Sequence, residues 1–158
     1  MIERPDAPAP PEGVDLQHIR MAVASRPLDA ISYLTFISPL VGGAAAEDRS
    51  APVVTIVDRI LLMAIQQGAD EVRFEAGRDD DLVVRLRRGE EWTALPSLSF
   101  AASVRSRLLV LGGLEKGQEA RAQVQTGSTT LYGAQISMTT EPIGPLRENI
   151  RVRIGPAA

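Results

Sequence analysis

The sequence predicts an α+β fold, with an antiparallel sheet of about five to six strands and two helices packed on one face of it. Apolar residues recur at helical spacing over residues 52–68 and 99–112, whereas the stretches between and after them alternate apolar and polar residues. That two-residue period is typical of half-buried strands. Because hairpins join neighbouring strands and both helices need one apolar surface to cover, we expect both helices on the same side of the sheet.

Composition divides the chain into four segments. Residues 1–13 are rich in proline and predict a disordered lead-in, residues 14–38 predict short N-terminal helices, and residues 39–51 predict a linker rich in Gly and Ala. Residues 52–155 form the expected α/β domain, which should fold without the first 45 residues. The helix over 52–68 is apolar nearly all round, so we expect an N-terminal helix to cover its second side.

The individual elements follow from local signals. Pro27 opens the second N-terminal helix, Pro52 opens the main helix and Gly68 ends it, while Ser99 caps the next helix and Gly112 ends it. The predicted strands cover residues 70–76, 82–88, a short stretch around Trp92, 120–126, 131–139 and 149–154.

Charge and residue content exclude several classes of function. With 17 Lys and Arg against 20 Asp and Glu, the net charge of −3 gives no overall field that would hold nucleic acid, and no apolar run approaches a membrane span. The N-terminus is unlike a signal peptide, so we expect a cytoplasmic protein. Zero cysteines exclude disulfides and thiolate zinc sites, and the single histidine, His18, excludes a site built on several imidazoles, so we expect no metal and no cofactor. Asp79, Asp80 and Asp81 lack the spacing of a calcium loop and predict a solvated turn.

The stretch Gly112–Glu119, GGLEKGQE, comes within two residues of a phosphate-binding loop. Such a loop needs Lys and then Ser or Thr after its second glycine, to neutralise phosphate and to hold magnesium. Gln118 and Glu119 stand in those positions, and a carboxylate there would repel phosphate. We therefore expect no ATP hydrolysis, and we interpret Gly112 and Gly113 as a helix terminator.

Arginines dominate the face of the sheet that the helices leave open. Alternation places six arginines on that face against only Glu71, Glu75 and Glu119, and the chain has a single lysine, Lys116. The candidate partner-binding or anion-binding residues are Arg73, Arg85, Arg87, Arg121, Arg151 and Arg153. Arginine suits planar carboxylate and phosphate partners, although the same residues could merely solvate the sheet. Because they are expected to be exposed, replacing Arg85 and Arg87, or Arg151 and Arg153, should change stability little.

Residues 52–154 resemble the second N-terminal domain of the traffic ATPases of type II secretion and type IV pilus assembly, the GspE/PilB family. The main helix and first strand, PVVTIVDRILLMAIQQGADEVRFEA, follow the family pattern P-I-x-x-L-V-N-x-I-L-x-x-A-I-x-x-G-A-S-D-I-H-I-E-P. The arginine pair of the family motif R-x-R-x-D-G is present as Arg85 and Arg87, and QEAR keeps Gln118 and Arg121 of P-Q-D-G-R. Departures include Arg73 in place of the family His and Ser137 in place of an Arg of D-L-R-V-S.

The resemblance implies a bacterial, cytoplasmic interaction domain without catalysis, because the residues end where the family's ATPase domain would begin. Its expected partner is a secretion or pilus assembly ATPase or the associated platform protein, and such a partner could recruit it to the inner face of the membrane. The alternative is a stand-alone sensor in which the arginine-rich face binds an anion or nucleotide directly. The sequence leaves the oligomeric state open.

Overall fold

The computed structural model describes residues 28–37, 52–77, 81–115, 117, 122–144 and 147–155. Several predicted features lie outside these residues. They are the lead-in 1–13, the first N-terminal helix with His18, the linker 39–51, Asp79, Asp80, Lys116, Gln118, Glu119 and Arg121.

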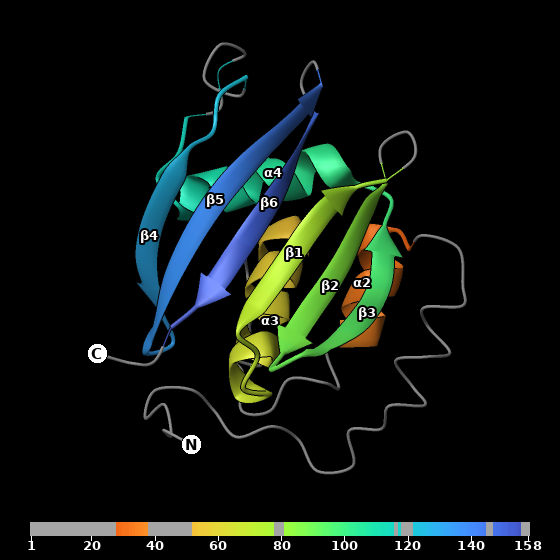
Figure 1. The fold of residues 1–158 in the computed structure, drawn as a ribbon. Coiled ribbons are helices and arrows are strands. Elements are labelled where there is room, and N and C mark those ends of the chain that lie inside the picture. Colours follow the sequence, from red (N-terminus) through yellow and green to blue (C-terminus); the bar gives the residue numbers. More distant parts are fainter. Residues whose placement is uncertain are drawn as a thin grey trace.

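Six antiparallel strands form one sheet in the order β3-β2-β1-β6-β5-β4, with three helices behind it in Figure 1. This arrangement confirms the predicted α+β class. The strands are β1 Glu71–Ala76, β2 Leu82–Arg88, β3 Glu91–Leu98, β4 Thr126–Leu131, β5 Ala134–Gly144 and β6 Arg147–Ile154. The helices are α2 Ala30–Ile37, α3 Pro52–Gln66 and α4 Ala101–Leu111.

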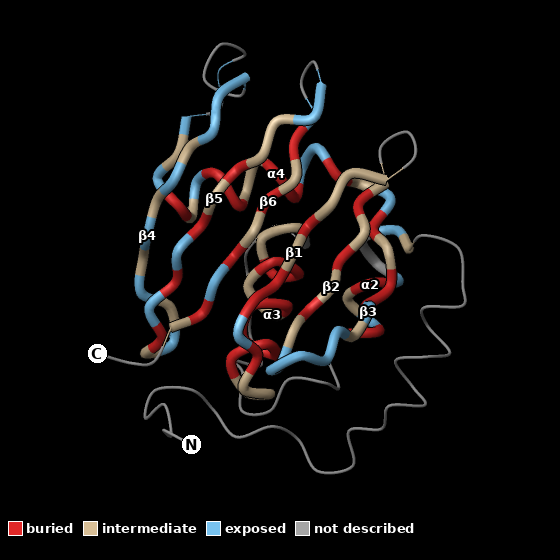
Figure 2. The backbone as a smooth tube through the Cα atoms, viewed as in Figure 1, coloured by how far each residue is buried: buried red, intermediate tan, exposed pale blue. Residues whose placement is uncertain are grey.

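One apolar core lies between the sheet and the helices, and Figure 2 shows buried residues along the helices and along every strand except β4. Helix α2 belongs to this core, since Tyr33, Phe36 and Ile37 are buried in it. The expected cover of the main helix by an N-terminal helix is thereby confirmed, because α2 packs against α3. The backbone of Leu28 ties the start of this segment to the end of β3, through hydrogen bonds with Ser97 and Ser99.

Glycines end α3 and α4 as predicted. Gly68 and Gly113 have φ of 71° and 67°, the left-handed conformation that terminates a helix without a steric cost in glycine. The predicted cap at the start of α4 is wrong: Phe100 occupies the N-cap position with no side-chain hydrogen bond. Ser99 Oγ instead donates to the carbonyl of Leu28 at 3.1 Å, so its hydroxyl joins two segments rather than capping the helix.

The β4–β5 hairpin corrects the predicted strands 120–126 and 131–139. Its turn is formed by Tyr132 and Gly133, with φ of 49° and 75°, so β4 lies later in the chain than predicted. Positive φ at both central residues matches the twist of a two-residue hairpin. Gly127 lies directly against α4, and a Cβ there would lie 2.1 Å from the carbonyl oxygen of Gly112. Only glycine allows this approach.

Candidate interaction face of the sheet

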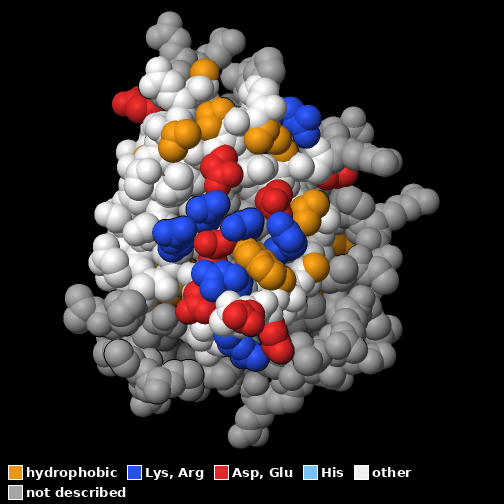
Figure 3. All heavy atoms as spheres, in the orientation of Figure 1, with side chains coloured by type: hydrophobic (Ala, Val, Ile, Leu, Met, Phe, Trp, Pro, Cys, Tyr) orange, Lys and Arg blue, Asp and Glu red, His pale blue; other side chains and the backbone are white. Residues whose placement is uncertain are grey.

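The sheet register brings five of the six predicted arginines together on the face away from the helices. Arg73 on β1 lies opposite Arg85 on β2 and Arg151 on β6. One pleat further along, Glu71 lies opposite Arg87 and Arg153. We call this surface the arginine face and define it by Arg73, Arg85, Arg87, Arg151, Arg153 and Trp92. Figure 3 shows these cationic side chains gathered at the centre of the molecule, with acidic side chains among them.

Glu71 is the centre of the arginine face, and its side chain is only 3% exposed. Arg73 Nε lies 2.6 Å from one carboxylate oxygen of Glu71. The other oxygen lies 3.6 Å from Arg153 Nε, 3.9 Å from Arg151 Nε and 4.0 Å from Arg87 Nη2. A buried carboxylate is costly unless opposite charges and hydrogen bonds surround it. The four guanidinium groups supply that surrounding, and Glu71 in turn reduces the repulsion among them.

Three further ion pairs occupy the margins of this face. Arg85 Nε donates to Glu75 at 2.6 Å, Arg151 Nη2 lies 3.0 Å from Glu141, and Arg87 Nη1 lies 3.8 Å from Asp70. This face therefore carries more acids than predicted, because Glu141 on β5 and Asp70, the residue before β1, join Glu71 and Glu75 there. Arg153 is the outermost member, with a side chain that is 65% exposed.

Trp92 on β3 extends the arginine face at its edge. It pairs with Arg87 in the β2–β3 register, and the guanidinium carbons of Arg73, Arg85 and Arg87 lie 4.9, 5.1 and 6.0 Å from its ring centroid. These distances are within the range of cation–π attraction. Sequence reasoning missed Trp92 because the contact depends on the register between β2 and β3. The indole is 39% exposed and can still reach a partner.

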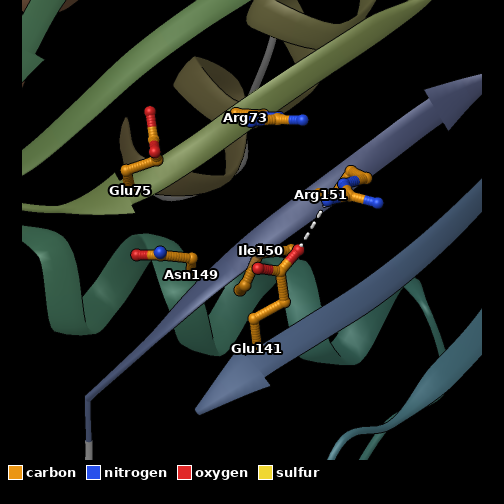
Figure 4. A pocket seen from close by; sticks show the side chains of 6 residues that line it. All are labelled: Arg73, Glu75, Glu141, Asn149, Ile150 and Arg151. Carbon is orange, nitrogen blue, oxygen red and sulfur yellow. Dashed lines mark ion pairs between the residues drawn. The ribbon is translucent and has the colours of Figure 1, made fainter. Parts of the chain in front are cut away.

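A small hollow lies between β1, β6 and β5, as the close view in Figure 4 shows. It is lined by Arg73, Glu75, Glu141, Asn149, Ile150 and Arg151. Both acids are already paired, Glu75 with Arg85 and Glu141 with Arg151. The hollow thus presents two carboxylates beside two guanidinium groups, a mixed rather than a purely cationic lining.

Other predicted features take ordinary structural roles. Gly112 and Gly113 terminate α4, as their interpretation from sequence requires, and the N–H of Leu114 bonds the carbonyl of Leu109 at 2.8 Å to complete that terminator. Within the described parts of the chain, no three His, Asp or Glu side chains are grouped to hold a metal ion. No helix in those parts is long and apolar enough to cross a membrane.

Comparison with known proteins gives no family assignment. No protein-family model matches the chain, and a search of curated proteins finds no matching relative. The resemblance to the secretion and pilus ATPases therefore stays a prediction that depends on the residues quoted above.

Proposed function

We propose that this protein is a non-catalytic docking domain that binds an acidic protein surface with its arginine face. The observation that supports this most directly is the excess of hydrogen-bond donors around Glu71. Each guanidinium carries five N–H donors, and one carboxylate accepts only about four hydrogen bonds. The arginine face therefore keeps donors for a partner while Glu71 holds the side chains in place, which lowers the entropy lost on binding.

The composition of this face also favours a protein partner. Tryptophan and arginine are the residues most enriched among those that dominate binding energy at protein interfaces. Here the guanidinium carbons of three arginines lie within 6.0 Å of the ring centroid of Trp92, which stays partly exposed. By the family resemblance, the partner is a secretion or pilus assembly ATPase or its platform protein, and binding would bring this cytoplasmic domain to the inner face of the membrane.

A nucleotide or other small anion is the less favoured ligand. The hollow beside Arg73 and Arg151 is the natural place for it, but Glu75 and Glu141 line the same hollow. Carboxylates at that range repel phosphate oxygens. A broad acidic surface can avoid these two acids and contact the outer arginines, whereas a small anion in the hollow cannot.

Co-purification of the full chain with the secretion or pilus ATPase of the same organism tests the proposal. We expect wild type and the control Arg88→Ala to retain the ATPase, and Arg153→Ala to lose most of it. Arg88 is a suitable control because it is an exposed arginine bonded to the carbonyl of Gln67, away from the arginine face. Equal retention by both variants would contradict the proposal.

Two further measurements on the isolated protein separate the alternatives. Trp92 is the only tryptophan, so its fluorescence during an ATP titration reports anion binding at the arginine face. A saturable change that Arg73→Ala abolishes would favour the sensor. Magnesium-dependent ATP turnover above a heat-treated control would contradict a non-catalytic role.

A further inference from the structure

The two edges of the sheet are built differently. Edge strand β3 carries several features that oppose pairing with another chain. Leu28 forms a bridge with Leu98 at its end, Pro96 lacks an N–H donor, Glu91 adds a charge, and the pairing with β2 shifts register. Natural sheets protect their edges with such devices.

Edge strand β4 has none of these devices. Its sequence, TGSTTL, contains no charge and no proline, and its register with β5 is unbroken. Along an antiparallel pair, every second residue of a strand forms backbone hydrogen bonds with its neighbour strand, and the residues between them point their backbone groups the other way. The bond from the N–H of Thr140 to the carbonyl of Gln125 shows which residues of β4 bond to β5. Gly127, Thr129 and Leu131 bond inward to β5. The N–H and C=O groups of Thr126, Ser128 and Thr130 therefore point outward, and within the described part of the chain no backbone group bonds to them.

Exposed apolar side chains border the same edge. Val124 precedes β4 and is 65% exposed, Tyr132 follows it and is 36% exposed, and Val110 in the last turn of α4 is 52% exposed. Val110 is two residues from Gly112, whose carbonyl lies against β4 at Gly127. Apolar exposure concentrated around an open hydrogen-bonding edge is typical of an interface.

We propose that β4 pairs with β4 of a second copy of this chain, antiparallel and about a two-fold axis at Ser128. In this register Ser128 lies opposite its own copy and Thr126 lies opposite Thr130 of the other copy. The strand suits itself as partner, because hydroxyl side chains face hydroxyl side chains and no like charges meet across the axis. Two-fold dimers are also the commonest assemblies of identical chains.

The pairing joins the two six-stranded sheets into one and places both arginine faces on the same side. Paired residues of adjacent strands project to the same side of a sheet, and Ser128 shares a face with Ser137 and Arg153 through the β4–β5 and β5–β6 registers. The pairing itself does not depend on the proposed docking function, and its test needs no partner protein.

Sedimentation of the full chain over a wide range of concentration tests the dimer, with a thermal melt of each variant as a check on folding. We expect wild type to be dimeric and Ser128→Pro and Ser128→Lys to be monomeric. The proline removes only an outward N–H, and the lysine places two charges at the axis. Ser137→Lys, the same change one strand inward, should stay dimeric. A monomeric wild type, or dimers in both Ser128 variants, would overturn the proposal.

Cross-linking tests the register independently, because the chain has no cysteine of its own. At the axis, the two Cα atoms of Ser128→Cys would lie about 5.5 Å apart, which suits a disulfide. The two Cα atoms of Thr130→Cys would lie roughly 14 Å apart, at about 3.4 Å for each of four residues. Mild oxidation should thus link Ser128→Cys into covalent dimers and leave Thr130→Cys unlinked, and equal linking of both variants would overturn this register.

Discussion

Arg73 donates from Nε to the carboxylate of Glu71 at 2.6 Å, two residues away on the same strand and the same face of the sheet. Since Glu71 is buried, this contact stabilises the fold as well as shaping the surface. The arginines of the face therefore differ in role. Arg73 anchors the buried acid, whereas Arg153 is largely exposed and makes one longer contact with it, at 3.6 Å.

This difference predicts that truncating the two arginines lowers stability by unequal amounts. Arg73→Ala removes the nearest partner of a buried carboxylate and should lower the free energy of unfolding by about 1–3 kcal/mol. Arg153→Ala should change it by no more than about 0.5 kcal/mol. Urea unfolding of both variants measures the two values. Equal losses would mean that Glu71 does not depend on Arg73.

The burial of Tyr33 should make the stability of the protein fall at alkaline pH. Its ring is fully buried, and burial raises the pKa of its hydroxyl well above the usual range. Its hydroxyl also has no hydrogen-bond partner within the described residues. The folded state binds this proton more tightly than the unfolded state, so stability is full below the unfolded pKa of about 10 and declines as pH rises beyond it.

Tyr33→Phe should remove this decline and raise the free energy of unfolding near neutral pH by about 1 kcal/mol, because a buried hydroxyl without a partner is eliminated. Denaturant melts of wild type and variant from neutral to strongly alkaline pH provide the comparison. The same alkaline slope in both proteins would contradict the assignment to Tyr33, and a less stable variant would indicate a partner for the hydroxyl.

Adding a side chain at Gly127 should destabilise the contact between β4 and the end of α4. In Gly127→Ala the new methyl group would overlap the carbonyl of Gly112, so the strand and the helix end must separate. We expect a loss of about 2 kcal/mol or more in the free energy of unfolding. Gly144→Ala is the control, since a Cβ there meets no atom within 4 Å. A thermal melt that ranks the two variants equally would refute the close contact.

Because α2 is part of the core, we expect a chain lacking the first 45 residues to be unstable. The sequence instead suggests that the α/β domain folds without them. The deletion removes Tyr33, Phe36 and Ile37 from the shared core and uncovers one side of α3. Each buried side chain of this size contributes about 1.5–3 kcal/mol, so we expect a total loss above about 5 kcal/mol. Circular dichroism melts of both chains decide the matter. An unchanged cooperative transition would show that the remaining residues suffice.

The class of the fold and most of its elements could be predicted from sequence because they depend on local periodicity and on glycine. The two-residue period located β1, β2 and β6 closely, and Gly68 and Gly112 located the ends of α3 and α4. The start of β4 could not be found in this way. Thr126–Leu131 contains mostly small polar residues, and its turn residue Tyr132 adopts a positive φ that the sequence gives no reason to expect.

The sequence predicted which arginines form the candidate site, but not the acids with which they pair. Alternation alone placed Arg73 and Arg151 on one face. That Glu71 would be buried beneath four guanidinium groups depends on the order β2-β1-β6, and therefore on a pairing between strands about 80 residues apart. The registers of two strand pairs adjacent in the chain, β2–β3 and β5–β6, bring Trp92 onto the arginines and Glu141 onto Arg151.

The proposed docking of the arginine face on a secretion or pilus ATPase is tested most directly by the affinity of the full chain for that ATPase, compared between Arg153→Glu and Arg88→Glu. Both variants change the net charge equally, but only Arg153 belongs to that face. We expect Arg153→Glu to weaken binding by tenfold to a hundredfold, about 1–3 kcal/mol, and to reduce its salt dependence, with Arg88→Glu close to wild type. Equal affinities for the two variants, or no binding by wild type, would contradict the account.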